Sequence, residues 1–245
     1  MVPFMTRAKI RLYVDHPLGQ GQSVALTREQ AHYLFGVMRL GVGDAVALFN
    51  GSDGEWLGQV VEAGKRYGVL ECAEQSLPQI DPPDLWLFFA PVKKARTDFI
   101  VEKSVEMGVS RLCPVQTEFT NSERIRQDRL QAHAVEAAEQ CGAVLVPPVD
   151  ELKRLDHVLA EWPENRRLLF CDEAQVGAAA SLPTEKGAPW AIIIGPEGGF
   201  SEAERTRLMA MPQATSIALG PRILRADTAA VAALTLWQST LGDWV

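Results

Sequence analysis

The chain has 245 residues, of which 47% are hydrophobic and 22% charged, so it is long enough to bury a sizeable core and ordinary for a globular protein. Its formal net charge of −7 excludes a protein that binds nucleic acid over its whole surface, because contacts with phosphate groups require Lys and Arg. No apolar run reaches the ~18 residues that a membrane span needs, and the start lacks a signal-peptide pattern, so we expect a cytoplasmic protein.

The first seventy-odd residues contain short candidate strands with turn signals between them. Asn50-Gly51 and Asp53-Gly54 mark a tight reversal between two of the strands. One helix interrupts the pattern, because Thr27 and Gln30 form a capping box and Gly41 is placed to end the helix. Several short strands with one helix predict a small barrel over residues 1–76. The candidate strands are Arg11–Asp15, Ser23–Leu26, Ala45–Asn50, Glu55–Ala63 and Gly68–Cys72.

A Pro-rich stretch then predicts a linker over residues 77–84 and a second domain over residues 85–245. In this second part, buried-strand candidates alternate with amphipathic segments, which predicts a mostly parallel sheet with helices on both faces. The strand candidates are Leu85–Ala90, Arg111–Gln116, Leu168–Cys171, Trp190–Ile194 and Ser216–Leu219. The helix candidates are a segment ending near Gly108, Asp128–Cys141, a segment capped by Ser201 and Glu204, and Thr228–Leu241.

Two segments of this second domain carry chemical information. The first is Gly195-Pro196-Glu197-Gly198-Gly199, which follows a buried strand and leads into a capped helix. Glycines let a ligand approach the backbone, and the start of a helix offers free N–H groups. The segment matches neither the dinucleotide fingerprint nor the phosphate loop. On its own, such a junction is more often only a tight turn.

The second segment runs from Leu219 to Thr228 and again follows a strand directly. It places Arg222, Arg225 and Asp227 at the carboxyl end of a strand, where open α/β sheets bind their ligands. The alternative is an aspartate that caps a helix beside surface arginines. Together the two segments favour a cofactor pocket.

These residues resemble a known family. Gly195–Glu204 (GPEGGFSEAE) and Leu219–Arg225 (LGPRILR) are similar to the paired signatures of the ribosomal RNA small subunit methyltransferase E family, a member of the SPOUT class. Three further segments resemble that family in the same order along the chain. They are His32–Leu34 leading to Val37–Leu40 and Gly43-Asp44, then Asp98–Val109, and then Ala137–Cys141.

The resemblance implies a PUA-like barrel, a SPOUT methyltransferase domain with a trefoil knot, and a homodimer. It also implies methylation at N3 of one uridine of 16S ribosomal RNA, with S-adenosylmethionine as the methyl donor. No metal is expected, because the four cysteines and four histidines are scattered along the chain. The cofactor-binding residues that it implies are Gly195, Pro196, Glu197, Gly198, Gly199, Leu219, Gly220, Ile223, Leu224 and Arg225.

The reaction itself suggests roles for three residues. Uracil N3 carries a proton, so the site must accept that proton or stabilise the charge that develops on the flanking carbonyl groups. We expect Arg225 to be the stabilising group and Glu197 or Asp227 to be the base. Basic residues concentrate near the start of the chain and after residue 92, and these predict the RNA contacts. They are Arg7, Arg11 and Arg39, and then Lys93, Lys94, Arg96 and Arg124.

The chain departs from the family pattern at two places in these segments. Ala226-Asp227 stands where the family usually has Thr-Glu, and Ala143 stands where an Arg is common. These departures keep two alternatives open. One is an RNA-binding assembly factor that has lost catalysis, and the other is a SPOUT methyltransferase that acts on another RNA. Fold alone does not separate them, because function depends on the site.

Overall fold

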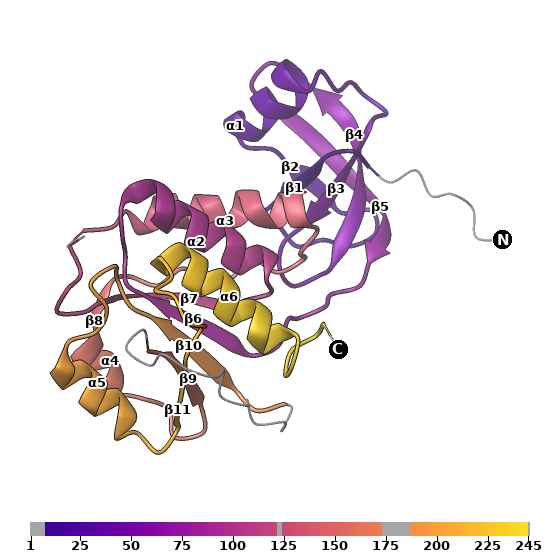
Figure 1. The fold of residues 1–245 in the computed structure, drawn as a ribbon. Helices are drawn as coiled ribbons and strands as arrows, with labels where there is room; N and C mark the ends of the chain where they lie inside the picture. The colour runs from indigo at the N-terminus through magenta and orange to yellow at the C-terminus, as the bar shows by residue number, and fades with distance from the viewer. Residues whose placement is uncertain (1–7, 122–123, 173–186, 245) are drawn as a thin grey trace. The chain divides into compact units, whose positions relative to one another are not determined.

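The structure is a computed structural model that describes residues 8–121, 124–172 and 187–244 (Figure 1). The chain divides into two compact units. Unit 1 runs to Asp81 and also includes Ala138–Val146, whereas unit 2 comprises Pro82–Ala137 and the chain from Pro147 onward. Each unit is described by itself. Of the helices in the described ranges, none combines the length and the apolar character needed to cross a bilayer.

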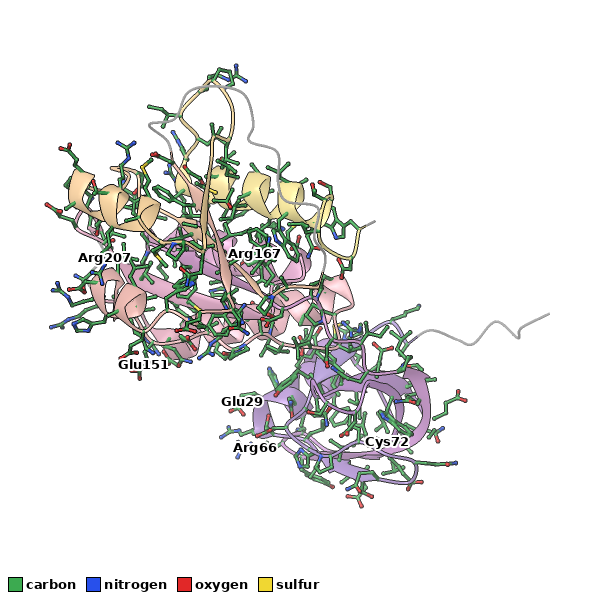
Figure 2. All side chains as sticks on the ribbon, turned by 90° about the horizontal axis from the view of Figure 1, so that it is seen from below. Glu29, Arg66, Cys72, Glu151, Arg167 and Arg207 are labelled. Atoms are coloured by element: carbon green, nitrogen blue, oxygen red, sulfur yellow. The ribbon has the colours of Figure 1, made fainter. Side chains whose placement is uncertain are left out.

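Unit 1 is built on a five-stranded sheet in the order β1-β3-β4-β5-β2. The strand β1 pairs in parallel with β3, and the remaining neighbours are antiparallel. Alternate side chains, such as Val46, Leu48 and Leu70, point into a shared core that also contains Cys72, which is labelled in Figure 2. The strands are β1 Arg11–Tyr13, β2 Ser23–Ala25, β3 Ala45–Phe49, β4 Glu55–Ala63 and β5 Gly68–Leu77. The strand β5 enters the predicted linker because Leu77 pairs with Glu55.

The helix of unit 1 begins as predicted and ends earlier. Both hydrogen bonds of the capping box between Thr27 and Gln30 are present at α1 (Arg28–Ala31), which continues as a π-helix over His32–Val37. The prediction that Gly41 ends the helix is wrong. The chain leaves the helix two residues earlier, at Arg39, whose φ of 60° lies in the left-handed region. Gly41 instead donates its N–H to the Asp44 carboxylate in the turn before β3.

The segment 138–146 joins unit 1 through Arg11. The Arg11 side chain is only 10% exposed, and its Nε donates to the Glu55 carboxylate at 2.6 Å. Its remaining nitrogens donate to the carbonyl oxygens of Ala138, Glu139 and Ala143. The guanidinium therefore ties β1 to a segment that lies more than a hundred residues later in the sequence.

Unit 2 contains a six-stranded sheet, in the order β11-β9-β10-β6-β7-β8, whose described pairings are all parallel. The predicted parallel sheet is therefore confirmed, and its central strand β10 is buried along its whole length. The strand predicted as Ser216–Leu219 both begins and ends two residues earlier. The strands are β6 Leu85–Phe89, β7 Arg111–Gln116, β8 Lys153–Arg154, β9 Arg167–Cys171, β10 Trp190–Ile194 and β11 Ala214–Ile217.

Helices cover both faces of this sheet. Leu155 of α4 and Leu208 of α5 pack with Phe170 and Ile193 against one face, while α2 and α6 lie side by side on the other (Figure 1). Gln238 fixes α6 against the end of α2, because its buried amide donates to the Met107 carbonyl. The helices are α2 Lys94–Glu106, α3 Gln127–Cys141, α4 Leu155–Ala160, α5 Glu202–Met209 and α6 Ala226–Gln238.

Candidate functional site

The carboxyl ends of three neighbouring strands of unit 2 surround a pocket of about 660 Å³ that is open to solvent on one side. We call it the loop pocket, because loops after β9, β10 and β11 supply most of its wall, while the ends of β9 and β10 and the helix α6 supply the rest. The lining residues are Cys171, Asp172, Ile194, Gly195, Pro196, Glu197, Leu219, Gly220, Pro221, Arg222, Ile223, Leu224, Ala226 and Ala229.

The loop after β10 owes its shape to one glycine and one aromatic ring. A Cβ on Gly195 would lie 2.9 Å from the Phe200 ring, so a larger residue there would displace that ring. Phe200 is buried against Phe170 with ring centroids 5.2 Å apart. Directly after it, Ser201 and Glu204 form both bonds of the predicted capping box of α5. The loop is therefore held at both ends and presents its backbone to the pocket.

The shape of the loop after β11 depends instead on the backbone conformation of Gly220. Gly220 has a φ of 112°, a conformation that side chains with a Cβ rarely adopt. This turn leaves Ile223 80% exposed at the rim of the pocket and places Arg225 at the N-cap of α6. The Arg225 side chain is exposed and makes no capping hydrogen bond.

Arg96, in the first turn of α2, lies between two carboxylates of the predicted site. Its Nη1 donates to Glu197 Oε1 at 3.3 Å, and its Nε lies 3.8 Å from Asp227 Oδ2. The three side chains are 28%, 40% and 21% exposed, respectively, so the pairs are partly screened by solvent. Glu197 comes from the loop after β10 and Asp227 from α6. The structure thus brings both candidate bases to one cation.

Asp172 is a lining residue that the sequence analysis missed. It follows β9 directly, its side chain is fully buried, and its Oδ2 accepts a hydrogen bond from Arg205 of α5 at 2.9 Å. The signal was a buried strand, Arg167–Cys171, that ends in an acidic residue, at the sheet edge where ligands bind. Arg205 compensates the buried charge of Asp172 and holds the carboxylate beside the pocket.

The predicted site residues fall into three groups. Seven of the ten predicted cofactor-binding residues line the loop pocket, whereas Gly198, Gly199 and Arg225 do not. Of the predicted RNA contacts, those with exposed side chains are Arg39, Lys93, Lys94 and Arg124. Arg11 and Arg96 are engaged by the contacts described above, and Arg7 lies outside the described residues. Within the ranges described, no three His, Cys, Asp or Glu side chains are grouped so as to hold a metal ion.

Two family models match the chain. The model described as an RNA methyltransferase domain matches residues 80–238, and the model described as an RNA methyltransferase PUA domain matches residues 26–71. Among curated relatives, ribosomal RNA small subunit methyltransferase E of Rickettsia conorii is 28% identical over 91% of this chain and 93% of the relative. The Bacillus subtilis protein of the same name is 26% identical over 88% of this chain and 90% of the relative.

Solved structures are similar over nearly the whole chain. Ribosomal RNA small subunit methyltransferase E from Neisseria gonorrhoeae, bound to S-adenosyl methionine, has a TM-score of 0.88 at 26% identity and covers 96% of this chain and 99% of its own. A methyltransferase described as putative from Legionella pneumophila, in complex with the same cofactor, has a TM-score of 0.85 at 29% identity and covers 96% and 98% of the two chains.

Proposed function

The chain belongs to the RNA methyltransferase family, of the ribosomal RNA small subunit methyltransferase E type, and we propose that it methylates N3 of one uridine in 16S ribosomal RNA with S-adenosylmethionine as the donor. The predicted fold, a PUA-like domain followed by a SPOUT methyltransferase domain, is confirmed. The loop pocket is the observation that carries the proposal, because it is built from the two segments that resemble the family signatures.

The residues of the loop pocket suit S-adenosylmethionine. The pocket offers the apolar side chains of Ile194, Ile223 and Leu224 for a nucleobase. The carboxylates of Asp172 and Glu197 are complementary to the positive charges of the donor. Gly195 leaves room for the buried Phe200 ring and Gly220 permits the turn after β11, so both glycines shape the wall of the pocket. When bound, the cofactor supplies a methyl group on a sulfonium, a group that needs a correctly placed nucleophile more than it needs an acid.

The chain's own residues then prepare the uracil. Its N3 proton must leave, and we assign the proton acceptor to the carboxylate of Glu197, with Asp227 as the alternative acceptor. Glu197 is preferred because it lines the loop pocket. Negative charge then spreads from N3 to the two uracil carbonyl oxygens, and we assign Arg225 to its stabilisation. Arg96 holds both carboxylates and acts as a positioning residue.

RNA binding and oligomeric state complete the proposal. The exposed side chains of Arg39, Lys93, Lys94 and Arg124 are the proposed phosphate contacts in the cytoplasmic small ribosomal subunit.

The chain is further proposed to form a homodimer. The helix α6 buries Leu234 and Trp237 in the core of unit 2, while Val231 and Leu236 stay only half-buried. Light scattering of the full chain at micromolar concentration should give the mass of two chains, and the mass of one chain would contradict this part.

The proposed function is tested by mass spectrometry of the nucleosides of 16S ribosomal RNA from cells with and without the gene. N3-methyluridine should disappear without the gene and return when the intact chain is supplied. A Glu197→Gln chain should restore little of it. Calorimetry on the purified protein should separately show binding of S-adenosylmethionine. If binding is seen and the modification persists without the gene, the substrate assignment is wrong. If no binding is seen, the chain is not a methyltransferase of this kind.

A further inference from the structure

A second cleft adjoins the loop pocket and shares one residue with it. This cleft, which we call the lysine cleft, is lined by Pro91, Val92, Lys93, Lys94, Asn121 and Glu197. Glu197 is common to its wall and to the wall of the loop pocket. A group held in the lysine cleft therefore lies next to the cofactor site, with a carboxylate between the two. We propose that the lysine cleft is the binding site of the target uridine nucleotide, an inference that rests on the proposed function.

The floor of the lysine cleft is held by buried hydrogen bonds. The backbone N–H of Val92 donates to Thr97 Oγ1 at 3.0 Å, and this hydroxyl donates back to the Val92 carbonyl at 3.0 Å. Two residues earlier, Ala90 donates to the carbonyl of Ile194 at 3.0 Å, which fixes the end of β6 to the end of β10. The cleft and the loop after β10 are thus held in one register. Such a fixed wall orients a reactant without a cost of reorganisation.

The contacts of Arg96 determine which charged groups around the cleft are already paired. Arg96 holds Glu197 and Asp227, while Lys93 and Lys94 are exposed and have no acidic partner among the residues that the structure describes. The carboxylates are therefore compensated, and the two ammonium groups are available for an anion. The 5′-phosphate of a nucleotide supplies such an anion, and so do the carbonyl oxygens of a uracil that is losing its N3 proton.

The remaining lining residues match the base itself. Pro91 and Val92 offer apolar surface to the face of a pyrimidine ring, and both are buried in the wall apart from the part that lines the cleft. Asn121 carries a carboxamide, which has a donor for a uracil carbonyl and an acceptor for an N–H group. Cytosine has an amino group where uracil has its O4 carbonyl, so a single amide orientation discriminates between the two bases.

The test uses the small subunit or 16S RNA with 4-thiouridine in place of the uridine that mass spectrometry identifies. Irradiation of its complex with the full-length protein should attach that nucleotide to peptides containing residues 91–94 or Asn121. A control RNA with 4-thiouridine at another position should not label these peptides. Crosslinks to other parts of the chain, or labelling no stronger than with the control RNA, would overturn the assignment. Calorimetry with S-adenosylmethionine alone checks the proposed function separately, because Lys93, Lys94 and Asn121 do not line the loop pocket.

Variants give a second readout. Asn121→Ala should lower kcat by about 10²-fold, the usual effect of losing one hydrogen-bond donor to a developing oxyanion. Its affinity for bulk RNA, its affinity for the cofactor and its melting temperature should stay within the error of the wild type. Lys93→Ala combined with Lys94→Ala should raise KM and flatten the salt dependence, and the matched control is Lys153→Ala, another exposed lysine of unit 2. An Asn121→Ala protein with normal kcat would remove the base-reading role of the cleft.

Discussion

Nη1 of Arg96 lies 3.3 Å from Oε1 of Glu197, and this contact joins the first turn of α2 to the loop after β10. The same guanidinium approaches Asp227 at the start of α6. Three elements that are far apart in the sequence therefore share one cation. These contacts place Arg96 beside two carboxylates of the candidate site.

The first prediction concerns this cation. Arg96→Ala should lower kcat for methylation because Glu197 and Asp227 lose their common partner, while stability changes by less than about 1 kcal/mol, as is usual for exposed ion pairs. Arg96→Lys should restore only part of kcat, since an ammonium group lacks the planar set of N–H donors with which a guanidinium can contact two carboxylates at once. Arg126→Ala is the matched control, because Arg126 pairs with Asp128 on the surface. Equal kcat for Arg96→Ala and the control would show that Arg96 has no positioning role.

The second prediction concerns the loop after β11. Gly220→Ala should destabilise the protein by about 1–3 kcal/mol, since its φ of 112° strains any residue with a Cβ. It should also weaken binding of S-adenosylmethionine, because the strained loop lines the pocket. Gly21→Ala introduces similar strain in unit 1, at a φ of 75° with no atom near the new Cβ. Calorimetry should give normal cofactor affinity for that control, and a normal affinity for Gly220→Ala as well would argue that the loop does not touch the ligand.

The third prediction concerns Arg225. If its guanidinium stabilises the deprotonated uracil, Arg225→Ala should slow methylation by about 10²–10³-fold, the usual effect of removing such a group. Melting temperature and cofactor affinity should be unchanged, because the side chain is exposed and makes no capping bond. A parallel loss of rate, affinity and melting temperature would indicate instead that Arg225 supports the loop. Near-normal turnover would remove it from the mechanism.

The fourth prediction separates stability from RNA binding in unit 1. Arg11→Ala should destabilise the protein by about 3–5 kcal/mol, because the buried Glu55 carboxylate loses its charged partner and three carbonyl groups lose the guanidinium as a donor. Lys9→Ala, a change at an exposed residue two positions earlier, should have little effect on thermal denaturation. RNA affinity of folded Arg11→Ala protein should match the wild type. A stable Arg11→Ala variant with weakened RNA binding would show instead that Arg11 contacts RNA.

The fifth prediction concerns pH. The hydrogen bond from Arg154 lowers the pKa of Asp156 from 3.8 to about 2. A carboxyl group whose pKa is lower in the folded than in the unfolded chain stabilises the folded state at pH values above the unfolded pKa. This contribution is therefore complete above pH 3.8 and is lost as the pH falls toward 2. NMR titration of the Asp156 carboxyl should show this pKa, and Arg154→Ala should raise it toward the ordinary value. An unchanged midpoint in Arg154→Ala would exclude the hydrogen bond as the cause.

Local sequence patterns predicted most of the helices and strands, whereas contacts between residues far apart in the chain could not be predicted from them. The capping boxes at Thr27 and Ser201 were read correctly because each depends on residues three apart. The end of the first helix was missed, since the turn at Arg39 precedes the glycine that marked it. Arg11 looked like a surface cation, because no pattern in the sequence reveals its carbonyl partners in residues 138–143. Asp172 was missed although it directly follows a buried strand, because only the fold shows its burial and its pairing with Arg205.

The division of unit 1 into two separate pieces of chain has a consequence for synthesis on the ribosome. The five strands are complete once Leu77 has emerged, but the acceptors for the Arg11 guanidinium come only with Ala138–Ala143. Until then the buried Arg11 guanidinium can pair with Glu55 but lacks its three carbonyl acceptors. The last contacts of this sheet therefore cannot form until more than half of the polypeptide has been synthesised. Pulse proteolysis of stalled chains should find unit 1 protease-sensitive when the chain stops before residue 138 and resistant when residue 146 has emerged.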